Sequence, residues 1–376
     1  MQDIVPFQPV RFGKDANFQT IAAHLLARAS SFDPVFRGLN STSVQLPTQD
    51  GSGDRLAIYV HKYEGYGAGE QPAVLLVHGL EADADGLYII KIAEKLLRAG
   101  FHVVRMNLRG CGIGKDLARH SYSAALTLDL ETVLEYIKRE VAPRVALVGY
   151  SLGAALTLKY LGEDRAERNR QRAVFGARPI RGPIRDRNVD VFCAISPPLD
   201  LLASSEQLDG PNCRFYRRRF LKAALERVSA VDFPHVRDHM DELMNAGSFF
   251  EFDNLFTAPV TGFQSAVDYY RRASSIHFLP NIETTGLLLH SLDDPLIFAG
   301  TFTDFDWKKV PGITPHLTEY GGHLGWVSVK HPLFPDRRWM DYRVLHYLLD
   351  WRDNIVPARR RPGWWDTFRD WLGRIQ

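Results

Sequence analysis

Short apolar runs alternate with longer amphipathic segments through the first half of the chain and again toward its C-terminus. The runs are rich in valine, isoleucine and leucine, which is typical of strands buried on both faces of a sheet. Two of the intervening segments, 87–99 and 126–140, have the helical spacing of apolar residues, and they end at Gly100 and just before Pro143. The predicted strands are residues 73–77, 101–106, 144–148, 189–195 and 285–290. Strands that alternate with helices predict the α/β fold class, with a mostly parallel sheet covered on both faces.

The segment 163–187 interrupts this alternation, because it holds eight arginines with glycines and prolines between them. Such a composition predicts a solvent-exposed surface loop or a frayed helix end. The alternative is that the arginines form a patch for an anionic partner.

A second interruption, residues 199–281, is too long for a simple connection. Helical spacing is evident around 215–228 and 236–244, so we predict that this stretch is an inserted helical lid. The predicted organisation is an N-terminal segment with the first part of the core (1–198), the lid (199–281), the second part of the core (282–356) and a tail (357–376).

The tail begins near a basic triplet, Arg359 to Arg361, and is predicted to end in a helix. The apolar residues on one face of that helix are Trp364, Phe368, Trp371, Leu372 and Ile375. We expect this aromatic stripe to pack on the body of the protein. The alternative is a contact with a membrane interface or with another subunit.

The overall composition indicates a folded protein, since 45% of the 376 residues are hydrophobic and 11% are aromatic. A formal charge of +2 gives no reason to expect nucleic acid as a partner. Cys111, Cys193 and Cys213 are too widely spaced to indicate a disulfide framework or a zinc site.

The chain shows no uninterrupted run of about 18 apolar residues, the length that a spanning helix needs. Its N-terminus lacks the basic and then apolar pattern of a secretory leader. We therefore expect a cytoplasmic protein without a spanning helix, in which the tail is the candidate for any peripheral membrane association.

The motif Gly149-Tyr150-Ser151-Leu152-Gly153 follows one of the predicted strands and precedes a helical run over 154–161. Small residues on both sides of the serine are needed where a strand and a helix nearly touch in a sharp turn. Such a turn exposes the serine hydroxyl at the carboxyl edge of the sheet, near the positive end of the helix. Ser151 is therefore the candidate nucleophile.

A serine hydroxyl needs a base to become a good nucleophile, and the base needs a carboxylate that orients it. His323 follows a predicted strand over 314–320 and is surrounded by glycines, so it is the candidate base. The acid is expected after the preceding strand, where Asp293 and Asp294 stand next to each other. We favour Asp294, because it is followed by one residue and then by an apolar pair, and Asp293 remains the alternative.

Two backbone N–H groups are expected to hold a developing oxyanion, those of Leu152 and Leu80. Leu152 follows the nucleophile, and Leu80 lies in the loop after the strand 73–77. His78 is expected to shape that loop. These groups together require neither a metal nor an organic cofactor.

The chain resembles the α/β-hydrolases of the YheT-like branch, which also contains the abhydrolase-domain proteins of types one to three. The resemblance extends from about residue 7 to residue 335. The segments that carry it are Asn17 to Thr20, His78 to Leu80, Asn107 to Cys111, Gly149 to Gly153, Ser196 to Leu201, Glu251 to Asp253, Thr257 to Pro259, Gly262-Phe263, Asp268 to Tyr270, Asp293 to Pro295 and Gly321 to His323. The segment 163–187 and the tail have no counterpart in it, and Ala82 stands where a glycine is expected.

The resemblance implies an α/β-hydrolase fold and a serine hydrolase that cleaves acyl esters or lipid-like esters through an acyl-serine intermediate. The implied triad is Ser151, Asp294 and His323. Aromatic residues of the lid are candidates to line an apolar acyl pocket, with packing inside the lid as the alternative: Phe215, Tyr216, Phe220, Phe249, Phe250, Tyr269 and Tyr270. Two other functions remain open, namely acyl transfer with the same triad and a non-catalytic binding protein on this fold.

Overall fold

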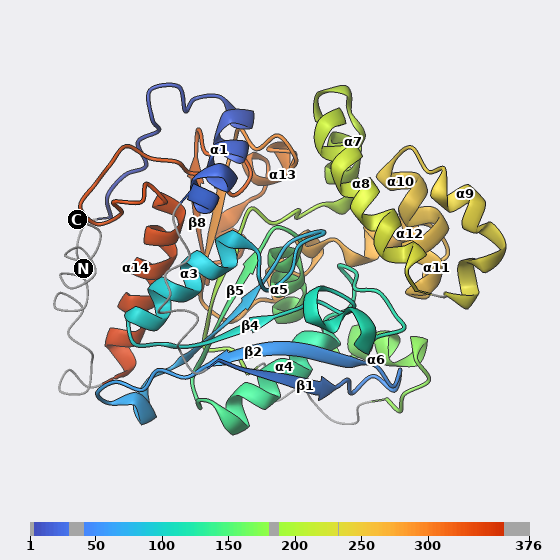
Figure 1. Cartoon of the computed structure of the whole chain (residues 1–376), viewed down its shortest axis with the longest axis horizontal. Coiled ribbons are helices and arrows are strands. Elements are labelled where there is room, and N and C mark those ends of the chain that lie inside the picture. The colour runs from blue at the N-terminus through green and yellow to red at the C-terminus, as the bar shows by residue number, and fades with distance from the viewer. Residues whose placement is uncertain (1–3, 30–40, 180–187, 232, 357–376) are drawn as a thin grey trace.

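An eight-stranded sheet forms the centre of the computed structural model, which describes residues 4–29, 41–179, 188–231 and 233–356 (Figure 1). The strand order is β1-β2-β4-β3-β5-β6-β7-β8. Strands β3 to β8 run parallel to one another. β1 and β2 form an antiparallel edge, in which β2 pairs with β4. The strands are β1 Ser41–Pro47, β2 Arg55–His61, β3 Ala73–Val77, β4 His102–Met106, β5 Val145–Tyr150, β6 Val191–Ile195, β7 Gly286–Ser291 and β8 Ile313–Thr318.

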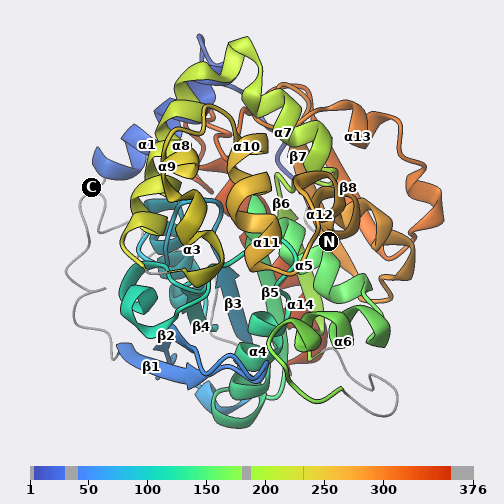
Figure 2. The same cartoon turned by 90° about the vertical axis from the view of Figure 1, so that its right-hand side faces the viewer.

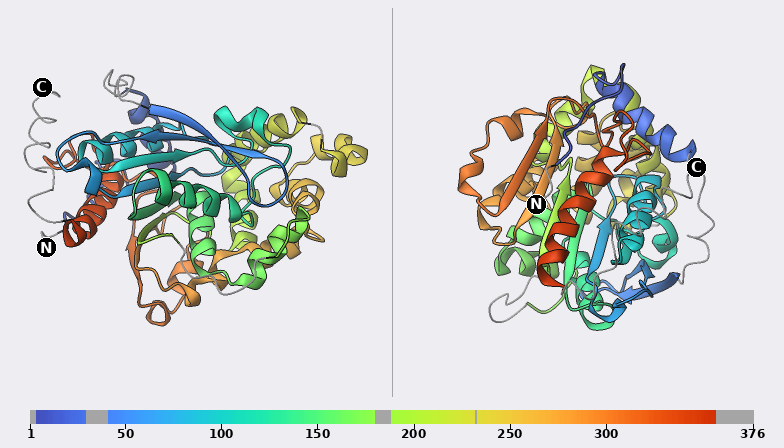
Figure 3. Two further views of the ribbon diagram at one scale, coloured as in Figure 1. Left: turned by 90° about the horizontal axis from the view of Figure 1, so that it is seen from below. Right: turned by 90° about the vertical axis from the view of Figure 1, so that its left-hand side faces the viewer.

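Alternate residues of the central strands point to two separate hydrophobic clusters, one on each face of the sheet. In β3, Val74 and Leu76 join α3 (Leu87–Arg98) and α14 (Trp339–Ile355). Figure 3 shows α14, in red, lying across this face of the strands. Leu75 and Val77 point to the opposite face and join α4 (Leu128–Glu140) and α5 (Leu152–Gly162). The parallel sheet covered on both faces is thus as predicted.

The segment between β6 and β7 is mainly helical and gathers at one end of the sheet, at the right of Figure 1 and toward the viewer in Figure 2. We call residues 199–281 the inserted segment. Its helices are α7 Leu201–Asp209, η3 Pro211–Cys213, α8 Arg214–Ser229, η4 Pro234–His239, α9 Met240–Met244, α10 Phe249–Phe252, the π-helix η5 Asp253–Thr257, α11 Ala258–Val260, α12 Ala266–Ala273, η6 Ser275–His277 and η7 Leu279–Asn281.

The remaining helices connect the strands or flank them. They are α1 Ala16–Ala29, η1 Ala68–Glu70, η2 Gly112–Leu117, α6 Arg165–Val174, α13 Gly300–Thr303 and η8 Trp307–Lys309. The tail 357–376 lies outside the described residues. The expectation that its aromatic stripe packs on the body therefore stays a prediction, and so does the alternative of an interface.

The prediction of a solvent-exposed loop over 163–187 is wrong for its first half, which forms α6. Asp164 caps this helix, and its side chain accepts a hydrogen bond from the Glu167 N–H at 2.8 Å. Glu167 and Arg168 are buried, because each forms ion pairs with residues of the core. A dense run of charges indicates exposure only when the charges do not neutralise one another inside the fold. Residues 180–187 lie outside the described part.

Candidate active site

Ser151 lies in a strained turn between β5 and α5, with φ 53° and ψ −120°. The turn requires both flanking glycines. A Cβ atom on Gly149 would lie 2.3 Å from the Gly153 carbonyl oxygen, and one on Gly153 would lie 2.5 Å from the His78 carbonyl oxygen. Strand and helix therefore approach closely enough to present the Ser151 hydroxyl at the carboxyl edge of the sheet.

His323 is carried by the loop after β8, and its side chain lies within hydrogen-bond distance of Ser151. Its Nε2 lies 3.0 Å from Ser151 Oγ, and its Nδ1 lies 2.8 Å from Asp294 Oδ2. The loop turns through Gly321 and Gly322, whose φ values of 152° and 59° are unfavourable for other residues. The structure thus brings Ser151, His323 and Asp294 into one chain of hydrogen bonds.

The two neighbouring carboxylates after β7 have different contacts. Asp294 is fully buried, and its Oδ1 accepts hydrogen bonds from the backbone N–H groups of Leu296 and Ile297 at 2.8 and 3.2 Å. Asp293 turns instead toward the histidine loop and accepts a hydrogen bond from the Gly322 N–H at 2.9 Å. Asp294 is therefore the carboxylate in contact with His323, and Asp293 holds the loop that carries it.

The loop after β3 lies against the serine. A Cβ atom on Gly79 would be only 2.9 Å from Ser151 Cβ, so glycine is required at this close approach. His78 braces the loop, since its Nε2 accepts a hydrogen bond from the Leu108 N–H while Nδ1 lies 2.8 Å from the Gly79 carbonyl oxygen. Burial lowers the pKa of His78 to about 4, so its ring is neutral near pH 7, as a bracing group of this kind requires.

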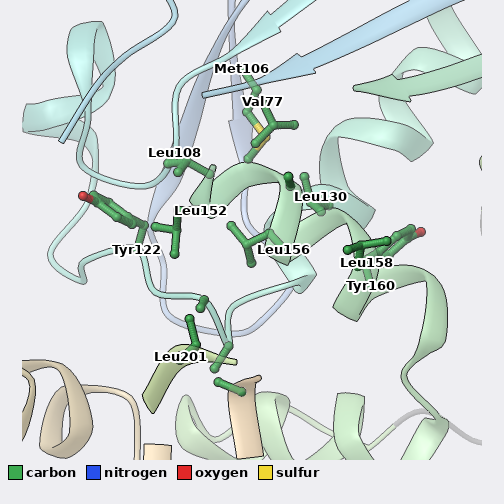
Figure 4. Packing of buried hydrophobic residues seen from close by; sticks show 14 of the residues in the cluster. Val77, Met106, Leu108, Tyr122, Leu130, Leu152, Leu156, Leu158, Tyr160 and Leu201 are labelled. Carbon is green, nitrogen blue, oxygen red and sulfur yellow. The ribbon is translucent and has the colours of Figure 1, made fainter. Parts of the chain in front are cut away.

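Leu80 and Leu152, the residues predicted to supply the oxyanion donors, lie on two different elements, the loop after β3 and the start of α5. Leu152 is the first residue of α5, so its N–H has no acceptor within the helix. Its side chain belongs to a packed cluster with Leu156, Leu108 and Tyr122, which fixes the start of α5 (Figure 4). The assignment of these two N–H groups as donors to an oxyanion beside Ser151 stays a prediction.

The alpha/beta hydrolase family matches residues 74–333, which is more than half of the chain. The chain belongs to this family. It falls in the branch that contains YheT and abhydrolase-domain proteins, so both the predicted fold and the predicted branch are confirmed.

Three relatives of this α/β hydrolase are informative. A putative esterase, YheT of Escherichia coli, is 28% identical over 360 residues, which is 94% of each chain. A monoacylglycerol lipase of Saccharomyces cerevisiae is 25% identical over 302 residues, covering 78% of this chain and 62% of the lipase. A medium-chain fatty acid ethyl ester synthase/esterase of the same yeast is 29% identical over 284 residues, covering 68% and 58%.

Among solved structures, the Pyrococcus furiosus esterase Pf2001 superposes with a TM-score of 0.52 at 15% sequence identity. The match covers 86% of this chain and 97% of the esterase. At that identity the likeness shows the α/β-hydrolase fold and nothing finer.

A cavity of about 800 Å³ opens beside Ser151 and His323 and lies between the sheet edge and the inserted segment. Its lining includes Ser151, His323 and Leu152, together with side chains of α1, α7, α8, α10 and α12. Of the aromatic residues predicted for an acyl pocket, those that line the cavity are Phe215, Tyr216, Phe220, Phe249, Tyr269 and Tyr270. Phe250 is not among the lining residues and is 41% exposed, so the prediction is wrong for that residue.

A carboxylate also reaches the cavity, from the π-helix η5. Asp253 accepts hydrogen bonds from Thr257 Oγ1 at 2.5 Å and from Tyr270 Oη at 2.7 Å. Burial, and the charge of Asp209 nearby, raise the pKa of Asp253 to about 6. Nothing in the local sequence pattern indicates that this residue faces a cavity.

Helix α1 supports the loop that carries His323, a contact that no local sequence pattern predicts. Thr20 Oγ1 accepts a hydrogen bond from the His323 N–H at 2.9 Å. Gln19 donates to the Val327 carbonyl at 3.2 Å and accepts from the Val327 N–H at 2.6 Å. These pairs join residues about 300 positions apart, so no local pattern could reveal them.

Within the described ranges, no group of three or more His, Cys, Asp or Glu side chains is arranged to hold a metal ion. Over the same residues, none of the helices has both the length and the apolar character needed to cross a bilayer.

Proposed function

We propose that this α/β hydrolase is a serine hydrolase that cleaves carboxylic esters through an acyl-Ser151 intermediate. The observation that carries the proposal is the chain of short contacts from Ser151 Oγ to His323 and on to Asp294, at 3.0 and 2.8 Å. The relatives named as esterase and monoacylglycerol lipase support an ester as the substrate.

In the first half-reaction, His323 Nε2 takes the Ser151 proton while the serine oxygen attacks the ester carbonyl. Asp294 holds the ring with Nδ1–H facing the carboxylate and stabilises the imidazolium that forms. Asp294 can do this without reorienting, because two backbone N–H groups already fix its other oxygen.

The negative charge that develops on the carbonyl oxygen is stabilised by the N–H groups of Leu80 and Leu152. Removing one such donor typically costs on the order of 10² to 10³ in rate. His323 then protonates the leaving alcohol, and in the second half-reaction it activates the water that releases the acid from Ser151.

The substrate is proposed to be an acyl or lipid-like ester, because side chains of the cavity beside Ser151 include Phe215, Phe220 and Phe249. Apolar surface of this kind favours a hydrocarbon chain over a strongly polar group. We expect kcat/KM to rise with acyl length until the chain fills the cavity.

The test is labelling with a fluorophosphonate together with hydrolysis of a series of p-nitrophenyl esters of increasing acyl length. Wild type should be labelled at Ser151 and should hydrolyse the esters. Ser151→Ala and His323→Ala should lose both, whereas Ser43→Ala and His239→Ala, at exposed positions, should retain them. An unlabelled wild type without esterase activity would support the non-catalytic alternative instead.

Acyl transfer is the second candidate, because one relative is named as both an ethyl ester synthase and an esterase. In that case an alcohol takes the place of water at acyl-Ser151. Ethyl ester formed in proportion to added ethanol would identify transfer, and free acid alone would identify hydrolysis.

A further inference from the structure

An ion pair joins the inserted segment directly to the loop that carries Leu80. Arg227, in the last turn of α8, donates from Nη2 to Glu81 Oε1 at 2.8 Å and from Nε to Glu81 Oε2 at 3.3 Å. The exposed fractions of the two side chains are 19% and 6%. This fork brings together residues 146 positions apart in the sequence.

Tyr122 completes the contact from the other side. Its hydroxyl donates to Glu81 Oε1 at 2.8 Å and accepts from the Glu81 N–H at 3.0 Å. The Arg227 guanidinium lies over the Tyr122 ring, 4.7 Å from its centroid, and also donates to Ser121 Oγ. Both the side chain and the backbone N–H of Glu81 are therefore held.

Glu81 needs to be held, because it has a left-handed backbone conformation with φ 48°. That conformation is unfavourable for a residue with a side chain, and it persists only where surrounding contacts impose it. Glu81 directly follows Leu80, whose N–H is one of the two proposed oxyanion donors. A shift at Glu81 would move that donor, and donors act only when they lie about 3 Å from the developing charge.

We propose that Arg227 and Glu81 are positioning residues for the oxyanion site. Through this ion pair, the position of α8 determines the alignment of the Leu80 N–H. The proposal rests on the serine hydrolase function proposed above. It gives the inserted segment a role in the rate of the reaction, in addition to lining the cavity.

The test compares Arg227→Met and Glu81→Gln with wild type on p-nitrophenyl butyrate, a short ester. Each variant should lose about 10- to 100-fold in kcat, a part of the loss that follows removal of a donor, with KM changed less than about threefold. If Arg227→Met fails to fold, Glu81→Gln, which keeps the size of the side chain, still tests the proposal.

A second readout reports on the oxyanion site itself, namely the ratio of rates between this ester and its thionoester, in which sulfur replaces the carbonyl oxygen. Sulfur is larger and a weaker acceptor, so well-aligned donors favour the oxygen ester. The rate on the oxygen ester divided by the rate on the thionoester should therefore fall in both variants. A lower fraction of folded protein would reduce both rates equally and leave the ratio unchanged.

Arg272→Met is the matched control. Arg272 belongs to the same inserted segment, pairs with Asp268 at 3.3 Å and lies over the Phe263 ring at 4.6 Å, and both of these partners belong to the inserted segment itself. It should leave kcat and the ratio close to wild type. An unchanged ratio in Arg227→Met and Glu81→Gln, with wild type active, would overturn the proposal. A wild type that neither reacts with the fluorophosphonate nor hydrolyses esters would overturn the proposed function, and this inference with it.

Discussion

The two oxygens of the Asp294 carboxylate have different partners. Oδ2 contacts His323, and Oδ1 accepts a hydrogen bond from the backbone of its own loop. In Asp294→Asn the amide oxygen can still accept from Leu296 and Ile297, but the amide NH₂ then faces His323 and favours the wrong tautomer. We expect kcat to fall by about 10⁴, as it does for the equivalent change in other triads. The unfolding temperature should change little, and steady-state kinetics with a calorimetric scan measures both.

Asp293→Asn is the control, because its side chain lies one residue away and contacts the Gly322 N–H instead of the imidazole. An amide oxygen can accept that hydrogen bond, so we expect less than about a tenfold loss in kcat. The assignment of Asp294 would be wrong if Asp293→Asn abolished activity and Asp294→Asn did not.

Asp253 should make stability depend on pH, because its pKa is raised to about 6 in the folded state by burial and by the charge of Asp209. The folded protein then binds more protons than the unfolded chain between about pH 4 and pH 6, so this group lowers stability as the pH rises through that window. In Asp253→Asn the contribution is absent.

The unfolding temperatures of wild type and Asp253→Asn, measured at pH 4.5 and pH 7.5, check this prediction. Relative to wild type, the stability of the variant should rise by roughly 2 kcal/mol from pH 4.5 to pH 7.5, while any loss from altered contacts to Tyr270 and Thr257 is the same at both. A difference between the two proteins that does not change with pH would contradict the raised pKa.

The side chains that form the hydrogen-bonded chain carry local marks in the sequence, whereas Arg227 and Glu81 carry none. Ser151 was marked by its two glycines, and His323 by its glycine-rich loop. Arg227 and Glu81 had no such mark, because an ion pair across 146 positions leaves no spacing to detect. The strained φ of Glu81 is visible only in three dimensions.

At the scale of elements, α5 and α6 are joined by buried charges. Lys159 Nζ lies 2.9 Å from both Glu163 Oε2 and Glu167 Oε1, and the Lys159 side chain is fully buried. Removing its charge in Lys159→Met leaves two carboxylates with less compensation inside the core. We expect the free energy of unfolding to fall by about 3–5 kcal/mol, measured by urea denaturation.

Lys222→Met is the comparison for that experiment. Lys222 also forms a pair of residues four positions apart, with Glu226, but at 3.7 Å and with both side chains largely exposed. Its loss should cost less than about 1 kcal/mol. Equal effects of the two substitutions would show that the buried network contributes no more than a surface pair.

Burial explains only some of the outcomes: β2 was missed although most of its residues are buried, and β8 was foreseen although most of its residues are only partly buried. Strands β3 to β7 were foreseen because they are apolar throughout, as strands covered on both faces must be. Strand β1 was missed, since most of its side chains are exposed and an edge strand needs no apolar run. Helix α6 was misjudged for the opposite reason, because its buried side chains are charged and their partners lie on other elements.

At the scale of the whole molecule, the inserted segment separates two parts of one sheet. Strands β6 and β7 are neighbours with parallel pairing from Phe192 to Ile195, although about 90 residues separate them in sequence. The length of this stretch and its helical spacing predicted that helices lie between these two strands. Its seating on the core was not predictable, because it depends on contacts such as that of Arg227 with Glu81.

The tail 357–376 follows α14, the last helix of the described residues. Helix α14 ends at Ile355 and is anchored before that point, where the Arg352 guanidinium donates to the Ala99 carbonyl oxygen. A chain that stops after Val356 should therefore keep the sheet, the triad and its activity on short esters.

Packing of the aromatic stripe on the body, the interpretation we favour, predicts that this truncation lowers the unfolding temperature by several degrees, because apolar surface becomes exposed. Sedimentation with vesicles that contain anionic lipid should then give the same bound fraction for full-length and truncated chains, and the oligomeric state should not change. Loss of vesicle binding or of a dimer upon truncation, with an unchanged unfolding temperature, would contradict packing. Such a result would assign the stripe and its three arginines to an interface, where aromatic side chains and cations act together.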